Sequence, residues 1–185
     1  MNKIVHIITG LGRGGAENTL LKYTKTFKNY THVIIYLSSN YSLKRNFDKK
    51  NCQLFFIKDI FKYYSWTYLI KKLFQKEKQF YLIGWMYHGG LIAALLNIFN
   101  KNLNTTIYLH HSSIFRGNLK IRTIFIALLL GVLTTFNRLK VIWCSNSGLK
   151  NHKFIYRSKF KKAIPNGFIV KKNINLIPKN LIQEK

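Results

Sequence analysis

Four glycines close to the N-terminus form the segment best suited to binding a ligand. Gly10, Gly12, Gly14 and Gly15 follow a short apolar run and precede residues with helical spacing. Glycine allows a sharp turn and a close approach of the backbone to a ligand, and the free N–H groups at a helix start favour a negative charge. The segment therefore predicts a turn that is suited to binding phosphate.

The spacing of these glycines disfavours two well-known nucleotide-binding motifs. Glu17 stands where a dinucleotide-binding Gly-x-Gly-x-x-Gly motif that starts at Gly12 would have its last glycine. The second apolar run ends in Ser38, Ser39 and Asn40, without the acidic residue that binds a ribose. No Gly-Lys-Ser or Gly-Lys-Thr ending is present either, so a nicotinamide or flavin cofactor and a nucleotide-hydrolysing P-loop are both disfavoured.

Charged side chains accompany this turn and a later loop. Glu17 falls in the first turn of the expected helix, where the helix dipole favours a carboxylate that accepts hydrogen bonds. Arg13 and Arg116 fall in loops after expected strands, and α/β sheets place their ligands at the carboxyl ends of strands. Both arginines are therefore candidates for phosphate contact, and solvated loop arginines are the alternative interpretation.

Seven apolar runs are expected to form the strands that position these residues. Most are rich in β-branched and aromatic residues and are apolar along nearly their whole length, as strands covered on both faces require. They are residues 3–9, 31–38, 53–58, 80–85, 105–110, 140–145 and 162–164.

Segments with helical spacing alternate with these runs. Residues 16–27 follow the glycine turn, residues 91–99 follow two further glycines, and residues 118–137 precede the sixth run, while Ser65 is a candidate cap for a helix at 66–75. The repeated order of strand and helix predicts an α/β fold with a Rossmann-like, doubly wound and mostly parallel sheet. We expect one domain at residues 1–167 and a linker or tail at 168–185.

The chain is strongly basic. It contains 31 Lys and Arg against five Asp and Glu, which gives a formal net charge of +26 at pH 7. This charge favours a polyanionic partner, namely nucleic acid, an anionic membrane or a phosphorylated substrate. An A/T-rich coding sequence also favours lysine, but that bias does not account for the shortage of acidic residues.

Several features favour a cytoplasmic protein. Cys52 and Cys144 are far apart and form no metal-ligand spacing or disulfide framework, which is typical of a reducing compartment. The N-terminal apolar run is short and lacks the cleavage site of a signal peptide. Residues 121–136 are nearly all apolar but are fewer than the roughly 20 that span a bilayer, so we expect a buried or interfacial helix.

Five segments, in order along the chain, resemble the N-terminal domain of the family 4 glycosyltransferases, which have the GT-B fold. The Gly-Gly-Ala-Glu run that ends at Glu17 is similar to that family's glycine loop, and the Trp-Met-Tyr-His run that ends at His88 is similar to an element of its polysaccharide-assembly members. Later segments resemble a strand with a His-Ser pair, a strand with a small-residue turn, and an Ile-Pro-Asn-Gly hinge. The five segments are residues 12–17, 84–95, 107–112, 141–147 and 164–168.

The resemblance implies one half of a two-domain enzyme, in which this half binds the acceptor and a second domain binds a nucleotide sugar. The glycine loop, with Gly12, Gly14 and Gly15, would approach the donor diphosphate. The family's catalytic histidine matches His111 through the serine that follows it, or His110 in a looser alignment.

Two further residues gain roles from the same resemblance. His88 would contact the acceptor or simply cap its helix, and Asn166 would lie in the hinge at the edge of the binding site. The nucleotide sugar is a substrate, and neither a cofactor nor a metal ion is implied.

The family's substrates imply where such an enzyme would work. We expect a lipid-linked or polysaccharide acceptor, as in capsule or lipopolysaccharide assembly, and a peripheral position at the inner face of the cell membrane. The chain departs from the family because Ile169 replaces the usual acidic residue after the hinge, and the paired glutamates of a donor domain are missing. We therefore expect a truncated form or a split-enzyme subunit that is inactive without a separate donor-domain subunit.

The alternative is a non-catalytic basic α/β module that binds nucleic acid or an anionic membrane. No helix-turn-helix, zinc-finger or RNA-platform pattern is present, and the aromatic residues lie in apolar runs, so nucleic acid is the less favoured partner. A metal hydrolase is also disfavoured, because the acids are scattered and His110 and His111 have no carboxylate partners nearby in the sequence.

Overall fold

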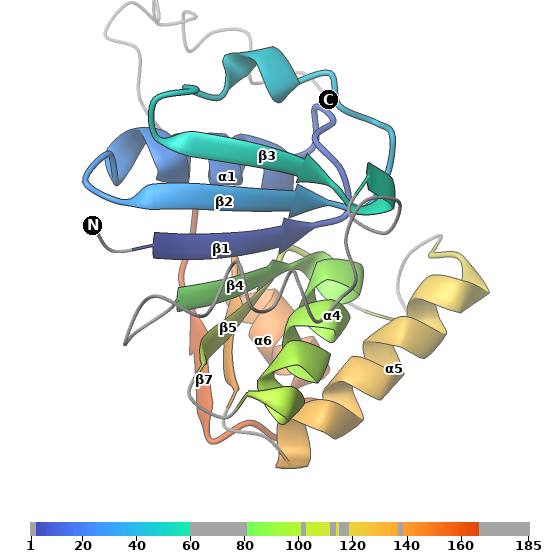
Figure 1. Ribbon diagram of the computed structural model, residues 1–185. Coiled ribbons are helices and arrows are strands. Elements are labelled where there is room, and N and C mark those ends of the chain that lie inside the picture. The colour runs from blue at the N-terminus through green and yellow to red at the C-terminus, as the bar shows by residue number, and fades with distance from the viewer. Residues whose placement is uncertain are drawn as a thin grey trace, which may run out of the picture.

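A single parallel sheet forms the centre of the protein. The computed structural model describes residues 3–59, 81–100, 103–111, 114, 119–136 and 139–166. Seven strands form the sheet within them, in the order β3-β2-β1-β4-β5-β6-β7, and each neighbouring pair is parallel (Figure 1). The strands are β1 (Lys3–Ile8), β2 (Thr31–Tyr36), β3 (Cys52–Phe56), β4 (Tyr81–Trp85), β5 (Asn104–Leu109), β6 (Lys140–Trp143) and β7 (Phe160–Ala163).

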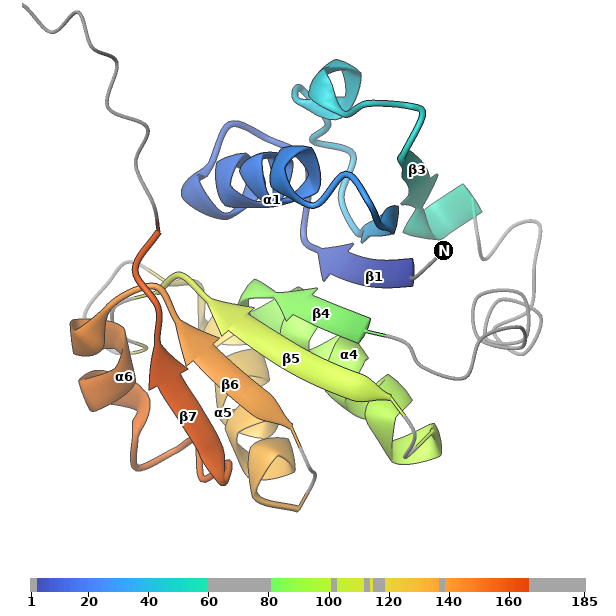
Figure 2. The same ribbon diagram turned by 90° about the vertical axis from the view of Figure 1, so that its left-hand side faces the viewer.

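Helices cover both faces of this sheet. Helix α1 (Gly15–Thr26) lies on one face, and α4 (Met86–Phe99) and α5 (Ile121–Phe136) lie beside each other on the other face (Figures 1 and 2). The short helix α6 (Asn146–His152) precedes β7, and the 3₁₀ helix η1 (Lys44–Asn46) follows β2. Because side chains alternate along a strand, the core divides into one apolar cluster beneath α1 and another beneath α4 and α5.

The structure confirms the predicted α/β class and all seven strands, whose ends differ from the prediction by no more than two residues. The predicted start of the helix at residues 91–99 is wrong, because α4 begins at Met86 and includes the glycines that were expected to precede it. Trp85 and Trp143 are buried in the core. The predicted helix at residues 66–75 and the tail at 168–185 lie outside the described residues.

Glycines allow α4 to approach the sheet closely. A Cβ atom on Gly84 of β4 would lie 2.7 Å from the Cα of Gly90 in α4, and one on Gly90 would lie 2.9 Å from Cγ2 of Ile107 in β5. A Cβ on Gly89 would collide with the carbonyl group of Ile7 in β1. The helix therefore rests on the backbones of β1 and β4, without side chains between them.

Replacing Gly89 with alanine is expected to destabilise the fold. The added Cβ would meet the Ile7 carbonyl carbon at 2.9 Å, and only a shift of α4 or β1 would relieve the collision. We expect the free energy of unfolding of Gly89→Ala to fall by about 1–3 kcal/mol or more, measured by urea denaturation. Gly15→Ala, at the first position of α1, is the matched control and should change it by less than about 0.5 kcal/mol. Equal stability of the two variants would contradict the close packing of α4.

Candidate functional site

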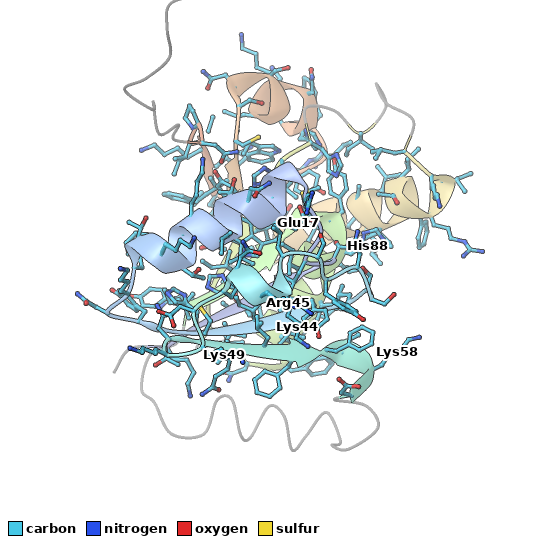
Figure 3. The ribbon with its side chains drawn as sticks, turned by 90° about the horizontal axis from the view of Figure 1, so that it is seen from above. Glu17, Lys44, Arg45, Lys49, Lys58 and His88 are labelled. Carbon is cyan, nitrogen blue, oxygen red and sulfur yellow. The ribbon has the colours of Figure 1, made fainter. Side chains whose placement is uncertain are left out.

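The strand order reverses between β1 and β4, and the candidate site lies at the carboxyl ends of these two strands. Open α/β sheets bind ligands at this position, because the connections from the two strands leave toward opposite faces. The first leads through the glycine loop to α1, and the second leads directly into α4 (Figure 2). Glu17 and His88, which lie in the first turns of these helices, are labelled in Figure 3.

Backbone hydrogen bonds tie the glycine loop to the loop that follows β2. The Leu11 N–H donates to the Asn40 carbonyl oxygen at 2.7 Å, and the Leu43 N–H donates to the Leu11 carbonyl oxygen at 2.8 Å. Gly10 and Gly12 face this second loop, and a Cβ on Gly12 would lie 2.8 Å from Nδ2 of Asn40. Packing between the two loops thus explains the first two glycines.

Gly14 and Gly15 begin α1 without a capping side chain. Gly14 is the residue that precedes the helix. Because glycine has no side chain, the N–H groups in the first turn of α1 have no side-chain acceptor at that position. The Glu17 carboxylate folds back against Gly14, at the end of the helix where the dipole favours a negative charge. The first N–H groups of a helix have no partner within the helix, so the exposed start of α1 offers donors to a ligand.

Gly15 and His110 come together from distant parts of the chain. The nearest atom to a Cβ built on Gly15, outside its chain neighbours, is Nδ1 of His110 at 3.9 Å, which is an ordinary contact distance. No glycine in the described part of the chain has a positive φ. Neither packing nor backbone conformation therefore requires a glycine at position 15, and a small side chain there would just touch the His110 ring.

The His110 ring is neutral at physiological pH. Burial, together with the neighbouring His111, lowers the pKa of His110 to about 4. The ring centroid lies 5.0 Å from that of Tyr108 and 6.1 Å from that of Trp85. Its Nε2 atom is buried without a hydrogen-bond partner among the described residues. A neutral imidazole carries one N–H, so the ring can donate one hydrogen bond and accept another.

His111 packs against Tyr87 of α4. Its ring is stacked on Tyr87, with the centroids 4.6 Å apart and an interplanar angle of 6°. The Tyr87 hydroxyl lies 2.7 Å from Nε2 of His152 and links α4 to α6. Burial lowers the pKa of His111, and His152 lowers it further. The two histidines thus have different surroundings, and only His110 lies beside Gly15.

Asn166, in the predicted hinge, is tied to β5. The Tyr108 hydroxyl lies 2.9 Å from Oδ1 of Asn166 and 3.1 Å from the Ile164 carbonyl oxygen, so its single proton is shared between two acceptors. The ring of Tyr108 also contacts the ring of His110. Tyr108 therefore connects two of the predicted site residues.

Cationic side chains lie around the glycine loop. Arg13 is exposed within the loop, and Lys44 and Arg45 lie in η1, directly after the residue that hydrogen bonds to the loop (Figure 3). The Lys44 ammonium group lies 5.8 Å from the ring centroid of Tyr36. Such groups attract phosphate without fixing its position. Arg116, the other arginine predicted to bind phosphate, lies outside the described residues.

Met86 has the one positive φ angle among the non-glycine residues that the structure describes, 62°. This conformation is uncommon for a long side chain, and it occurs where the chain turns directly from β4 into α4. Strained residues of this kind concentrate at functional sites. His88 follows in the same turn, where burial lowers its pKa.

Sequence reasoning missed three residues of this site, each for a physical reason. Met86 carries no chemical signal of its own, although the flanking glycines could have indicated a crowded turn. Tyr108 and Asn40 act through contacts with residues that are distant in the sequence, which no local pattern reveals.

A buried chain of hydrogen bonds lies in the sheet below the site. The indole N–H of Trp85 donates to Nδ1 of His6 at 3.2 Å, so the His6 proton lies on Nε2, which is 3.0 Å from Nδ1 of His32. His32 then donates from Nε2 to the Phe27 carbonyl oxygen at 2.9 Å. Burial lowers the pKa of His6 well below its ordinary value and also lowers the pKa of His32. Both rings are therefore neutral, with defined tautomers.

Two solved structures share this architecture. The Anabaena protein Alr3699/HepE, determined in complex with UDP, matches 90% of this chain with a TM-score of 0.66 and 15% sequence identity. The N-terminal domain of Candida albicans trehalose-6-phosphate phosphatase matches 89% of it with a TM-score of 0.50 and 14% identity. The fold is Rossmann-like. At these identities the likeness extends to the fold and no further.

The chain spans less than half of either structure, 44% of Alr3699/HepE and 48% of the Candida albicans domain. No family model matches the chain, and no curated protein matches its sequence. Within the described ranges, no group of His, Cys, Asp or Glu residues is arranged to hold a metal ion. None of the helices in that part of the chain has the length and apolar character needed to cross a membrane.

Mild acid is expected to destabilise the protein. Burial lowers the pKa of all six histidines below the ordinary value of about 6.5, so the unfolded chain binds more protons in acid than the folded one. Their contribution to stability is complete above about pH 6.5 and is lost as the pH falls toward the folded-state pKa, about 4 for His110. We expect the unfolding temperature to be constant at pH 7–8 and to fall steadily below pH 6.5, measured by circular dichroism. His110→Gln should show a shallower fall, and an identical pH profile would count against the lowered pKa of His110.

Proposed function

We propose that this chain is the N-terminal, acceptor-side domain of a glycosyltransferase that moves a sugar from a nucleotide sugar to a lipid-linked or polysaccharide acceptor. The Rossmann-like fold supports this proposal at the level of the fold. A structure with the same fold was determined in complex with UDP, which is the type of product that a nucleotide-sugar donor leaves.

The observation that carries the proposal is that the exposed start of α1 at Gly15 lies beside the ring of His110. A sugar diphosphate leaving group gains negative charge as its bond to the sugar breaks, so catalysis requires hydrogen-bond donors aimed at that charge. The N–H groups at the start of α1 supply such donors, and Gly15 leaves them accessible. His110, neutral and with Nδ1 directed toward Gly15, would donate one further hydrogen bond to the donor sugar or its phosphate.

The proposal assigns the remaining residues by their positions. Arg13 would neutralise phosphate charge from the glycine loop, and His88, in the first turn of α4, would face the acceptor. Asn166, held by Tyr108, would mark the passage to a second domain. That domain would bind the nucleotide and the sugar. The nucleotide sugar is the substrate, and no resident cofactor is invoked.

We further propose that the domain works at the inner face of the cell membrane, where lipid-linked acceptors are presented. The formal net charge of +26 would attract anionic lipids and the phosphate groups of such an acceptor. The second domain would be part of the same polypeptide or a separate subunit.

Titration with UDP tests the role of Gly15 in binding phosphate. In NMR spectra of the isotope-labelled chain, UDP should shift the amide signals of Gly14, Gly15 and Ala16 and the ring signals of His110. Gly15→Val should weaken this binding by roughly tenfold or more, because losing hydrogen bonds to a charged group costs about 1.5–3 kcal/mol. Thr26→Val, at the other end of α1, is the matched control and should leave the affinity unchanged.

The same titration can refute the assignment. Shifts confined to lysine-rich surfaces, with equal affinities for the parent chain and Gly15→Val, would mean that UDP binds only through the net charge. Inorganic diphosphate should produce the same shifts at α1 if the phosphates are what this site recognises.

A further inference from the structure

Helix α5 presents a continuous apolar surface to solvent. Its exposed side chains recur at helical spacing on one side of the helix, and their exposure ranges from 37% for Leu128 to 82% for Ile121. We call them the α5 stripe, and they are Ile121, Phe125, Leu128, Leu129 and Val132. Because each is a large apolar side chain, the stripe is an unusual surface for a protein that meets only water.

The opposite side of α5 is already packed in the core. Ala127 and Leu130 belong to the cluster beneath the helix, and Gly131 lies against Ile155. The helix is thus apolar both where it meets the sheet and where it faces outward, and Figure 1 shows it beside α4 at the outside of the molecule. Leu95, Ile98 and Phe99 of α4, the neighbouring helix on the same face of the sheet, are also exposed.

The length of α5 determines how it can meet a membrane. Its 16 residues are about 24 Å long at 1.5 Å per residue, which is shorter than the apolar core of a bilayer. With its inner side held by the sheet, the helix can lie only in the plane of a surface. This is the geometry of an interfacial helix, whose apolar side enters the boundary between headgroups and acyl chains.

The charges around α5 identify the kind of partner. No acidic residue occurs between Glu77 and Glu184, so the part of the chain that contains α4, α5 and α6 carries only positive charge. Lys120 and Arg122, both exposed, lie at the start of α5. A second copy of the chain would bring two such cationic surfaces together, whereas an anionic lipid surface complements both the charge and the apolar stripe. A nucleic acid would match the charge but would leave the stripe in water.

We propose that the α5 stripe inserts into the headgroup region of an anionic bilayer, with Lys120 and Arg122 binding lipid phosphates. This inference rests on the proposed membrane-associated function and gives it a specific docking element. Helix α5 starts on the side of the sheet where β5 ends, which is also the side of Gly15 and His110. Docking through α5, on the opposite face of the sheet from α1, would therefore leave this edge and the candidate site uncovered for an acceptor.

Vesicle sedimentation tests this proposal with surface substitutions. The parent chain should bind vesicles of phosphatidylcholine and phosphatidylglycerol at physiological salt and bind pure phosphatidylcholine far more weakly. The double variant Phe125→Ser/Val132→Ser should bind the anionic vesicles with an affinity at least roughly tenfold lower, because two apolar side chains no longer enter the bilayer. Phe160→Ser, at an exposed apolar residue of β7, is the matched control and should bind like the parent chain. Lys120→Gln/Arg122→Gln should weaken binding to anionic vesicles and reduce its salt dependence.

Several outcomes would overturn the proposal. Equal vesicle binding by the parent chain and the double variant would show that the α5 stripe does not contact the bilayer. Equal binding to neutral and anionic vesicles would show that the cations do not contribute to binding. A dimer in light scattering that dissociates in the double variant, without a change in vesicle binding, would assign the stripe to self-association. All three variants replace exposed residues, and their unfolding temperatures should match that of the parent chain.

UDP titration of the same double variant separates this proposal from the proposed function. Loss of vesicle binding with unchanged UDP shifts at Gly15 supports the stripe and leaves the sugar-transfer site intact. Vesicle binding through the stripe in a chain that shows no UDP shifts would support docking while the proposed function fails. UDP shifts in a parent chain that binds no vesicles would refute docking alone.

Discussion

Gly84, Gly89 and Gly90 leave no room for a side chain between α4 and the strands on which it rests. This close approach places the first turn of α4 directly at the end of β4, so the chain has no loop in which to relax, and Met86 takes a positive φ angle. The strain at that residue is a local cost that the packing of a whole helix offsets. Because the same helix also contacts β1, its position determines how the turn at Met86 lies relative to the glycine loop. The geometry of the candidate site thus depends on backbone contacts that any larger residue would disrupt.

The sequence was sufficient to predict the strands because most of them are apolar along nearly their whole length, whichever strand they pair with. It failed at the start of α4, because Gly89 is locally unfavourable in a helix and its contact with β1 is visible only in three dimensions. It also left His110 and His111 as alternatives, since successive side chains at the end of a strand point to opposite sides and the run itself does not say which side holds the ligand loop. The link from Tyr108 to Asn166 joins residues far apart in the chain and has no local signature.

The candidate site combines neutral buried groups with exposed cations, and the two kinds of group do different work. Burial keeps His110 uncharged, so it can orient a ligand through one directed hydrogen bond without repelling its cationic neighbours. Burial also keeps His6 and His32 uncharged deeper in the sheet. In the hydrogen-bonded series from Trp85 to His6 and His32, every polar atom of the three rings has a partner. Attraction at longer range falls to exposed side chains such as Arg13, whose charge acts over about 8–10 Å in physiological salt. The buried histidines can stay neutral and well positioned, since exposed cations supply the charge that attracts a ligand.

The distribution of charge distinguishes a functional surface from a compositional bias. An A/T-rich coding sequence would raise the lysine content everywhere and would leave the few acidic residues scattered along the whole chain. Four of the five acidic residues, Glu17, Asp48, Asp59 and Glu77, lie in the first half of the chain, and the long segment that contains α5 has none before Glu184. That acid-free segment is also the one that exposes a continuous apolar stripe. An acidic residue beside the stripe would be repelled by anionic headgroups and would cost energy to bring to the boundary with the acyl chains. Docking on an anionic bilayer would therefore account for both the missing acids and the exposed apolar side chains.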